Sequence, residues 1–599
     1  MSHVIADYRT QLGKRGAICA KLARMTTFND PQMHRSMDDH PRIATRHDAL
    51  LISKGPPVLY HLNTERKYID GTDEKVRWWT YGRRDRNKQN KVILMVGETA
   101  AEKTTMINTM INYLLGVKFE DEEFYQITDE EEKHEDQTQS QTSDITVYEV
   151  FVKENPTALT IIDIPGYGDT EGYEKDIKMT HYLFKLLFDE KGIHYIDAVC
   201  FVMKASQNRL SGKELYIFHS TLSLFGKDIE NNIVFLLTQA AGGPPTDALN
   251  AIKTADIPCR RDEGNEPVHF LFNNQQKAKR EKRYERGLKV SWEKEDKSMT
   301  EFFTFLEEQN RKSVPMTLEV LKERGRLEAC FSSLVDRISE KEEKTEERKQ
   351  IQEALRLNRD KIEKCENFKF TVHKDEKKQV LTKNVNVKYL ICNDKATCCS
   401  VCKETCHDEQ ACWWAPDPSK CEIMIDGHCT VCTGKCHQDK HVKENKKYVT
   451  VKSEVTMTFD ELKQEYENTD EKTVTDFDKN KYENTKKTHE SDVKESENIT
   501  AIERKLVNDL EKIQNEKSKL LDEAYVAIMS LSKIALKADS AFTLQHLDFL
   551  IPRLKEEGKE EWVKDLEDLK KTGEEKKNKG AVQYLMAFGQ QNWNALLQK

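Results

Sequence analysis

The sequence predicts an α/β domain with a mostly parallel sheet flanked by helices, followed by a helical segment, a small cysteine-rich module and an α-helical C-terminal domain. Three observations lead to this prediction. Short β-rich runs alternate with helical patterns between about residues 56 and 297, as is typical of parallel sheets. Ten of the 15 cysteines lie between Cys392 and Cys436. Beyond residue 457 the chain is highly charged and helical in pattern.

The sheet is predicted from six β-rich runs, most of which are separated by longer segments. Two other strand-like runs, VLYHL and VRWWTY, come before the first of the six. A helix is predicted directly after the first run of the sheet, because Met106, Ile107, Met110, Ile111 and Leu114 fall on one side of it. The runs are NKVILMVG (90–97), ITVYEVFV (145–152), ALTIID (158–163), DAVCFVM (197–203), NIVFLLT (232–238) and VHFLFN (268–273).

Composition and charge exclude several classes of protein. The chain is 37% hydrophobic and 33% charged, and its net charge of −9 argues against a general nucleic-acid binder. The sequence contains no run of about 18 apolar residues, so no membrane span is predicted. The N-terminus lacks the apolar stretch of a signal peptide, so we expect a cytoplasmic protein in a reducing compartment.

Composition shifts divide the chain into five predicted parts. The expected parts are an N-terminal extension (1–55), the α/β domain (56–297), a helical linker (298–368), the cysteine-rich module with flanking strands (369–457) and a charged helical domain (458–599). In the last part, apolar residues recur every three or four positions from Ile499 to Leu531. This period is nearer 3.6 than 3.5, so it favours a bundle helix over a long two-stranded coiled coil.

An imperfect phosphate-binding loop connects the first sheet strand to the predicted helix. The pattern G-x-x-x-x-G-K-[ST] is matched at Gly97, Lys103 and Thr104, but Glu102 stands where the last glycine belongs. Lys103 would neutralise phosphate charge, Thr104 would bind Mg²⁺, and Thr105 is a further nucleotide-binding candidate. The octet alone is weak evidence.

Polar residues at the ends of later strands strengthen the interpretation. Asp163 ends a hydrophobic strand and would hold the Mg²⁺ shell, and the amide of Gly166 would meet the γ-phosphate. Thr142 lies just before a strand, where a switch threonine could close onto the metal. Thr238 and Asn273 end the two later strands, where the base-reading loops belong.

These motifs resemble those of the immunity-associated (GIMAP, AIG1-type) and septin-like P-loop GTPases, and in particular a group of fish proteins with a cysteine-rich segment after the G domain. The similar text spans about residues 90–275 and includes VILMVGET, SQTSDITVYEV, LTIIDIPGYGDT and HFLFNN. The resemblance implies a GTPase fold, GTP or GDP with Mg²⁺, self-association linked to nucleotide, and GTP hydrolysis as the activity to be tested.

The departures from this family concern the contacts with nucleotide. Members usually read GETGAGKT, but this chain has Ala100 and Glu102 in place of two glycines. Members usually read TxxD after the fifth strand, and here Ala241 replaces the aspartate that reads guanine. These losses would weaken GTP binding, and hydrolysis would be weak or absent.

A duplicated C-x₂-C-x₃-C-H pattern identifies a candidate zinc module. Two closely spaced thiolates reach one ion, and Zn²⁺ takes four sulfur or nitrogen ligands. Disulfides and free thiols are the alternatives, but a reducing compartment favours the metal. Cys392, Cys398, Cys412, Cys421, His428 and His441 surround the repeats. The candidate ligands are Cys399, Cys402, Cys406, His407, Cys429, Cys432, Cys436 and His437.

Three functional hypotheses follow. The first is a guanine-nucleotide switch or GTPase that self-associates or binds another protein. The second is a nucleotide-free pseudo-GTPase that serves as an interaction scaffold. In the third, the cysteine-rich module is the partner-binding part, and the α/β domain is a dimer surface.

Overall fold

The computed structural model describes most of the chain between residues 48 and 574. All described residues belong to Ala44–Lys599, one of the two units into which contacts divide the chain. Within the described span, the residues left out are 68–75, 86, 99–100, 129–144, 165–172, 241, 309–310, 364–366, 383–384, 388–389, 393–394, 408–416, 468–489 and 539.

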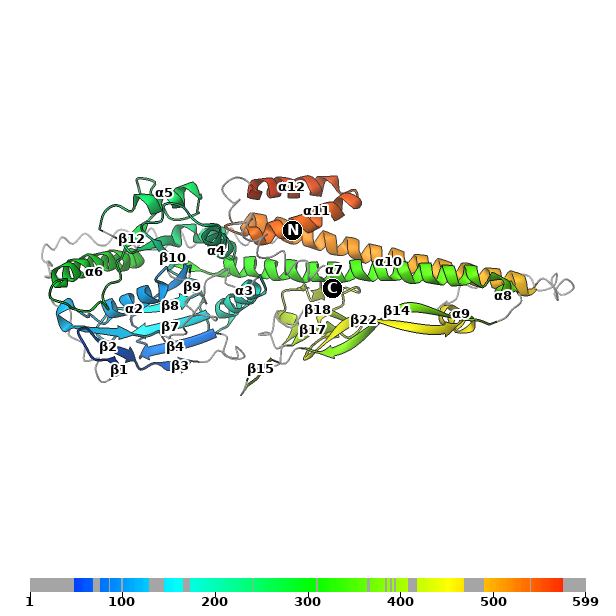
Figure 1. The fold of residues 1–599 in the computed structure, drawn as a ribbon, viewed down its shortest axis with the longest axis horizontal. Coiled ribbons are helices and arrows are strands. Elements are labelled where there is room, and N and C mark those ends of the chain that lie inside the picture. The colour runs from blue at the N-terminus through cyan, green and yellow to red at the C-terminus, as the bar shows by residue number, and fades with distance from the viewer. Residues whose placement is uncertain are drawn as a thin grey trace, which may run out of the picture. The chain divides into compact units, whose positions relative to one another are not determined.

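An eight-stranded, mostly parallel sheet forms the centre of the first domain (Figure 1). Its order is β12-β11-β10-β5-β8-β7-β4-β3, and only the β7–β8 and β3–β4 pairs are antiparallel. This confirms the α/β fold class. The strands are β3 (Glu65–Lys67), β4 (Val76–Gly82), β5 (Gln89–Gly97), β7 (Ile145–Phe151), β8 (Thr157–Asp163), β10 (Ala198–Lys204), β11 (Ile233–Thr238) and β12 (His269–Leu271).

Helices and short strands surround this sheet. The predicted helix after β5 forms, and its five apolar residues are at most 2% exposed, so they pack into the core as the periodicity indicates. The surrounding elements are α2 (Lys103–Leu114), α3 (Tyr173–Phe188), α4 (Gly212–Leu222), α5 (Thr246–Thr254), α6 (Glu285–Glu308), β1 (Ala49–Ser53), β2 (Val58–Leu62), β6 (Glu123–Gln126), β9 (Tyr195–Ile196) and β13 (Lys312–Ser313).

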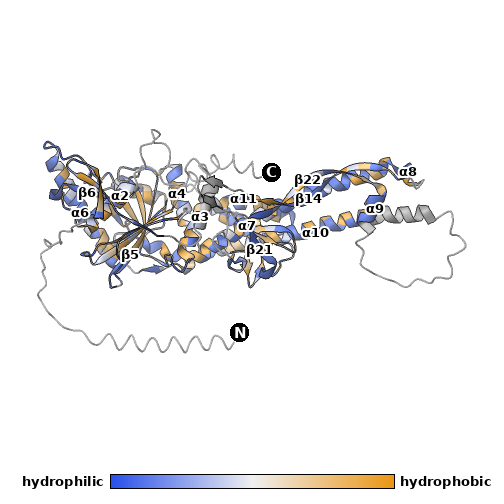
Figure 2. Cartoon of the chain, turned by 90° about the horizontal axis from the view of Figure 1, so that it is seen from below, coloured by the Kyte–Doolittle hydropathy of each residue, from blue (hydrophilic) through white to orange (hydrophobic). Residues whose placement is uncertain are grey.

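The core of this domain lies between the sheet and its helices. Figure 2 shows hydrophobic residues along the strands around β5, as expected for parallel strands buried on both faces. At the edge of the core, Arg311 pairs with the fully buried Asp197 at 3.2 Å. That carboxylate also accepts a hydrogen bond from the backbone N–H of Val92 at 2.7 Å. The buried charge of Asp197, just before β10, therefore joins β5 to Arg311, which comes just before β13.

Two long helices pair antiparallel after the α/β domain. They are α7 (Pro315–Leu357) and α10 (Glu490–Ile534). Arg326 on α7 pairs with Glu523 on α10, and Lys341 donates a hydrogen bond to Gln514 at 2.6 Å. The pairing is therefore within one chain. The remaining helices of this part are α8 (Arg359–Glu363), α9 (Phe459–Glu467), α11 (Ala541–Glu556) and α12 (Glu560–Glu574).

Apolar side chains fill the contact between α7, α10 and α11. Leu334, Leu521 and Leu547 are fully buried there. The run SEKEEKTEERKQ in α7 is highly charged and supplies little apolar surface. Burial of the apolar side chains along this face therefore stabilises the helices more than intrinsic helix propensity does.

The cysteine-rich module is inserted between the long strands β14 (Lys369–Leu381) and β22 (Lys446–Thr458), which pair antiparallel along their whole length. It contacts α7, where Arg337 pairs with Glu404 at 2.5 Å. The module contains β15 (Val385–Val387), β16 (Leu390–Cys392), β17 (Ala396–Cys399), β18 (Glu404–His407), β19 (Met424–Ile425), β20 (His428–Cys429) and β21 (His441–Glu444).

Truncation of Leu334 to alanine should destabilise the helical part by about 2–5 kcal/mol, because the side chain is fully buried and its removal leaves a cavity. Leu357→Ala is the matched control on the same helix, since Leu357 is 66% exposed. The urea midpoint followed by circular dichroism measures both. Equal midpoints for the two variants would show that the α7–α10 contact is not tightly packed.

Candidate nucleotide site and thiol clusters

The phosphate-binding loop begins where β5 passes close to its neighbour β10. Gly97 pairs with Val202 in the parallel register. A Cβ atom on Gly97 would lie 2.7 Å from the carbonyl oxygen of Val202, which is too close for any side chain. Glycine is therefore required here by the packing of β5 against β10, and the chain leaves the sheet edge at this residue.

Lys103 is the first residue of α2 and lies against the end of β8. Its Nζ atom is 2.7 Å from Oδ1 of Asp163, and it also donates to the backbone carbonyl of Ile164. Both side chains are at least nine-tenths buried. The pairing of Met95 with Asp163 across β5 and β8 brings these two charges together. Lys103 and Asp163 thus lie together at the carboxyl edge of the sheet.

The first turn of α2 presents Thr104 and Thr105, both partly buried. The N-terminus of a helix offers unpaired N–H groups and a partial positive charge, which suit a phosphate. No acidic residue lies in this first turn. A hydroxyl, a cation and a carboxylate are therefore within one small region, and this is the donor set that a Mg²⁺–phosphate group needs.

Glu102 adopts a left-handed backbone conformation with φ of 66° and ψ of 27°. This is the position at which the phosphate-loop pattern has glycine, so the strain expected from the sequence is present, at about 1–2 kcal/mol. Its carboxylate accepts hydrogen bonds from Gln239 Nε2 at 2.9 Å and Asn274 Nδ2 at 3.0 Å. The acidic side chain is therefore turned toward the loops that follow β11 and β12.

Thr238 ties the end of β11 to the phosphate loop. Its fully buried hydroxyl lies 3.2 Å from the carbonyl oxygen of Ala101 and 3.4 Å from that of Met203, and it donates to these acceptors. The predicted base-side threonine is thus close to the loop. It contacts the protein backbone through its hydroxyl.

Asn273 faces helix α6. Its backbone N–H donates to Glu295 at 2.7 Å, and its side-chain amide donates to Ser291 at 3.0 Å. Burial raises the pKa of the Glu295 carboxyl to about 7, although backbone N–H groups of the loop favour its charged form. Glu295 therefore anchors the loop after β12, and Asn274 is the residue of this loop that turns to Glu102.

Several predicted site residues lie outside the described residues. These are Thr142, Gly166, Ala100 and Ala241. In the described part of the chain, Gly97, Lys103, Thr104, Thr105, Asp163 and Thr238 gather at one edge of the sheet, and Asn273 lies beside it. The contacts of Glu102 with Gln239 and Asn274 were not foreseen, because they depend on the left-handed turn and on how three loops meet.

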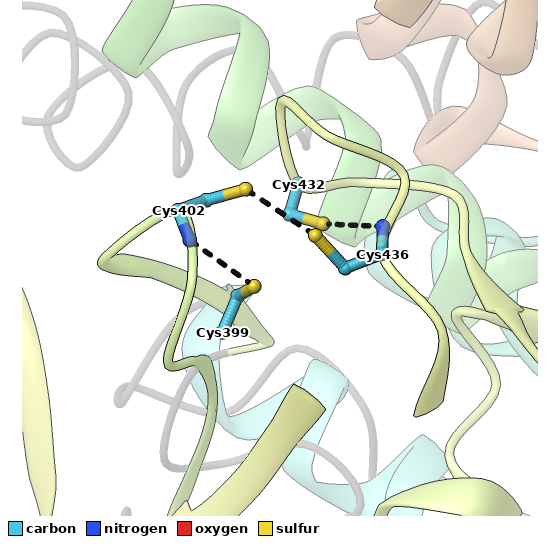
Figure 3. Close-up of side chains that lie close together, drawn as sticks. All are labelled: Cys399, Cys402, Cys432 and Cys436. Carbon is cyan, nitrogen blue, oxygen red and sulfur yellow. Dashed lines mark hydrogen bonds between the residues drawn. The ribbon is translucent and has the colours of Figure 1, made fainter. Parts of the chain in front are cut away.

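Four cysteines converge in the module (Figure 3). Cys399 ends β17, Cys402 lies in the loop after it, and the other two come from the second repeat. The four sulfurs lie within 4.8 Å of one another. Cys402 Sγ and Cys436 Sγ are 3.6 Å apart, which is far beyond a disulfide bond length. The set is Cys399, Cys402, Cys432 and Cys436.

A second group shares one cysteine with the first. It contains Cys406, Cys429, Cys432 and His441, again within 4.8 Å, and all four side chains are buried. His441 pairs with Cys399 across β17 and β21. Sequence repetition favours His437 as the ligand. The structure places His437 at the surface, where its Nδ1 lies 2.8 Å from Asp439.

His407 belongs to a third buried group, with Cys421 and Glu422. Its Nδ1 is 3.1 Å from Cys421 Sγ and 3.6 Å from the Glu422 carboxylate. Burial opposes the charged imidazolium, but the thiol and the carboxylates outweigh it and raise the His407 pKa to about 9. This group packs against α7, where Gly325 approaches Glu422. The three groups together contain all the predicted zinc ligands except His437.

The fold and these polar groups define a P-loop GTPase-type domain. Residues 88–185 match the septin family model, which covers β5, α2, β7, β8 and most of α3. Among the described helices, none has the length and apolar character needed to cross a bilayer.

Solved structures resemble the domain weakly. Toc33 from Arabidopsis thaliana, in complex with Mg²⁺ and GMPPNP, is 13% identical with a TM-score of 0.25, over 38% of this chain and 89% of that chain. Translation elongation factor SelB from Methanococcus maripaludis, in complex with GppNHp, is 12% identical with a TM-score of 0.22, over 38% of this chain and 36% of that chain. No curated protein matches the sequence.

The anchoring of the loop after β12 should depend on pH. The pKa of Glu295 rises from 4.5 to about 7 on folding, so the unfolded state loses its proton first as pH rises. Protonated Glu295 makes its full contribution to stability below a pH of about 4.5. As the pH rises through about 7 this contribution is lost, and the free energy of unfolding falls by roughly 3 kcal/mol. Glu295→Gln should remove this pH dependence, because the amide stays neutral.

Urea midpoints across this pH range measure the effect. Glu301→Gln on the same helix is the control, since the Glu301 side chain is 57% exposed, and it should leave the pH profile of the wild type unchanged. Parallel profiles for wild type and Glu295→Gln would contradict the assignment.

Proposed function

We propose that this protein is a guanine-nucleotide-binding protein of the GTPase class with weakened nucleotide contacts, which works as a self-associating switch or scaffold. The observation that carries the proposal is the buried pairing of Lys103 with Asp163 at 2.7 Å, beside Thr104 at the start of α2. A Mg²⁺–phosphate group would enter here, with Thr104 and Asp163 toward the metal and Lys103 toward the phosphate oxygens.

The phosphate end of the site supports binding better than the base end. Lys103, Thr104 and Asp163 are all present and adjacent, whereas the guanine-reading aspartate is replaced by Ala241. Loss of two hydrogen bonds to the base removes roughly 3 kcal/mol or more. A site without that acceptor also loses its preference for guanine over adenine.

Glu102 adds one further cost to binding. Its carboxylate near the phosphates costs one to several kcal/mol at an effective dielectric of about 20, whereas its left-handed backbone, at about 1–2 kcal/mol, is a cost to folding. With the lost base contacts the summed loss of binding free energy is roughly 4–6 kcal/mol, and a micromolar ligand has about 8 kcal/mol of binding free energy. Affinity in the millimolar range therefore follows.

A nucleotide-free scaffold is the second candidate function. The observation that favours it is that the carboxylate of Glu102 accepts hydrogen bonds from Gln239 and Asn274, so the loop residue nearest the phosphate position is satisfied by the protein itself. Nucleotide would have to break or rearrange these bonds. In this case the cysteine-rich module is the candidate partner-binding part.

Restoring the lost groups should restore GTP binding. Calorimetry with Mg²⁺ should detect no binding in the parent below about 100 μM. The triple variant Ala100→Gly, Glu102→Gly, Ala241→Asp should bind in the micromolar range, because the loop amides can face the phosphates and the guanine acceptor returns. The repairs act at opposite ends of the ligand, so their effects should add approximately.

Two controls sharpen this experiment. Lys103→Ala in the triple variant should abolish binding again, which ties the signal to the phosphate site. The triple variant should prefer GTP to ATP, whereas Ala100→Gly with Glu102→Gly alone should show little preference. Tight GTP binding by the parent would contradict our account of Glu102, and failure of the triple variant would favour the nucleotide-free scaffold.

Assembly provides the second test. Light scattering with a saturating non-hydrolysable GTP analogue should shift the triple variant toward a larger species, because a ligand that favours one state shifts the population toward it. The parent should not respond at about 100 μM analogue. An equal response of the two proteins would contradict the link between the degraded contacts and assembly.

A further inference from the structure

The thiol clusters of the module carry a more specific inference than a single zinc site. We propose that the module binds two Zn²⁺ ions that share the thiolate of Cys432. The first ion takes Cys399, Cys402, Cys432 and Cys436, and the second takes Cys406, Cys429, Cys432 and His441. The proposal does not depend on the nucleotide site.

The need for a shared ligand follows from the donor count. Each group has four ligand atoms within 4.8 Å of one another only if Cys432 belongs to both. Structural zinc requires four tetrahedral ligands, so either ion would have three protein ligands without Cys432. Two ligands at tetrahedral angles on one zinc lie about 3.8 Å apart, and Cys402 and Cys436 are 3.6 Å apart.

Backbone N–H groups surround the sulfurs as expected for metal-bound thiolates. The N–H of Cys402 donates to Cys399 Sγ at 3.4 Å, and that of Cys436 donates to Cys432 Sγ at 3.2 Å (Figure 3). Gly434 N–H donates to Cys402 Sγ at 3.3 Å. Six thiolates and two Zn²⁺ ions carry a net charge of about −2, and hydrogen bonds from amides stabilise the charged sulfurs.

The second group contains the same kind of contact. The N–H groups of Val431 and Cys432 both donate to Cys429 Sγ at 3.3 Å. These bonds come from a tight turn that holds two cysteines on one side, which is the geometry of a C-x₂-C zinc knuckle. Cys432 therefore contacts both groups. Its sulfur accepts a hydrogen bond from the N–H of Cys436 in the first group, and its own N–H donates to Cys429 in the second.

His441 is oriented as a metal ligand. Its Nδ1 lies 3.1 Å from the carbonyl oxygen of His437, which can only accept, so Nδ1 carries the proton. Its Nε2 is buried and makes no hydrogen bond within the described part of the chain. A carbonyl that fixes the tautomer of a ligating histidine is a common supporting contact at zinc sites. The lone pair of Nε2 is then available to the metal.

Gly434 marks the space next to the first group. A Cβ atom there would lie 2.9 Å from Cys436 Sγ and 3.2 Å from Cys402 Sγ. The loop between Cys432 and Cys436 thus passes directly against the sulfurs, and glycine leaves room for them. Both ions would be closed by four protein ligands, so the centre is structural and has no open position for catalysis.

Metal content of the reduced, full-length protein is the first test. Elemental analysis should find two zinc ions per chain. Cys402→Ser and His441→Ala should each retain one ion, because each removes a ligand from only one group. Cys432→Ser should lose tight binding of both. Cys398→Ser is the matched control, since Cys398 is buried beside Cys399 and its thiol faces Lys446 O and Thr405, and it should retain two.

Cadmium-113 NMR of the wild-type protein tests the bridge without any variant. Two resonances should appear, and each should be split by the other through the shared sulfur. His441→Cys should keep two metal ions, which a merely structural histidine would not predict. One ion per chain, iron in place of zinc, or two uncoupled cadmium resonances would each overturn the proposal.

Discussion

Antiparallel packing of α7 against α10 is the contact on which much of the described chain depends. It brings together residues as far as 197 positions apart, as in the pair of Arg326 with Glu523. The same α7 contacts the module through Arg337 and Glu404. Just after the C-terminal end of α10, Leu536 donates its backbone N–H to the carbonyl oxygen of Phe225 in the α/β domain at 2.9 Å. Helices with so many charged residues need this buried face to be stable.

Charge is placed differently in the two candidate sites. In the α/β domain, Lys103 and Asp163 neutralise each other in a buried position, and the carboxylate of Glu102 is satisfied by two side-chain amides. A ligand there competes with bonds that the protein already makes. In the module, buried thiols lie beside one another and accept weak N–H bonds. A cation there would relieve a cluster that the protein alone satisfies poorly.

The contacts of Glu102 change the meaning of its substitution. From the sequence alone, an acidic residue in a phosphate-binding loop is predicted only to repel phosphate. The structure adds a bond network that joins three loops at the sheet edge, through Gln239 and Asn274. Thr238 joins the same loops through Ala101. The substitution therefore stabilises one arrangement of the three loops, which its effect on charge alone would not do.

The sequence by itself determined the α/β fold and singled out Lys103 and Asp163 as candidate site residues, because strand periodicity and motif order indicate which residues follow the parallel strands at one edge. It also identified the cysteine repeats as a candidate metal module. Only the tertiary structure decided that His441, and not His437, joins the sulfurs, since the antiparallel register of β17 and β21 sets it opposite Cys399. It also decided that Cys432 lies between two groups and that Glu102 turns toward Gln239. Such contacts depend on how separate loops meet in space, and spacing along the chain carries no information about that.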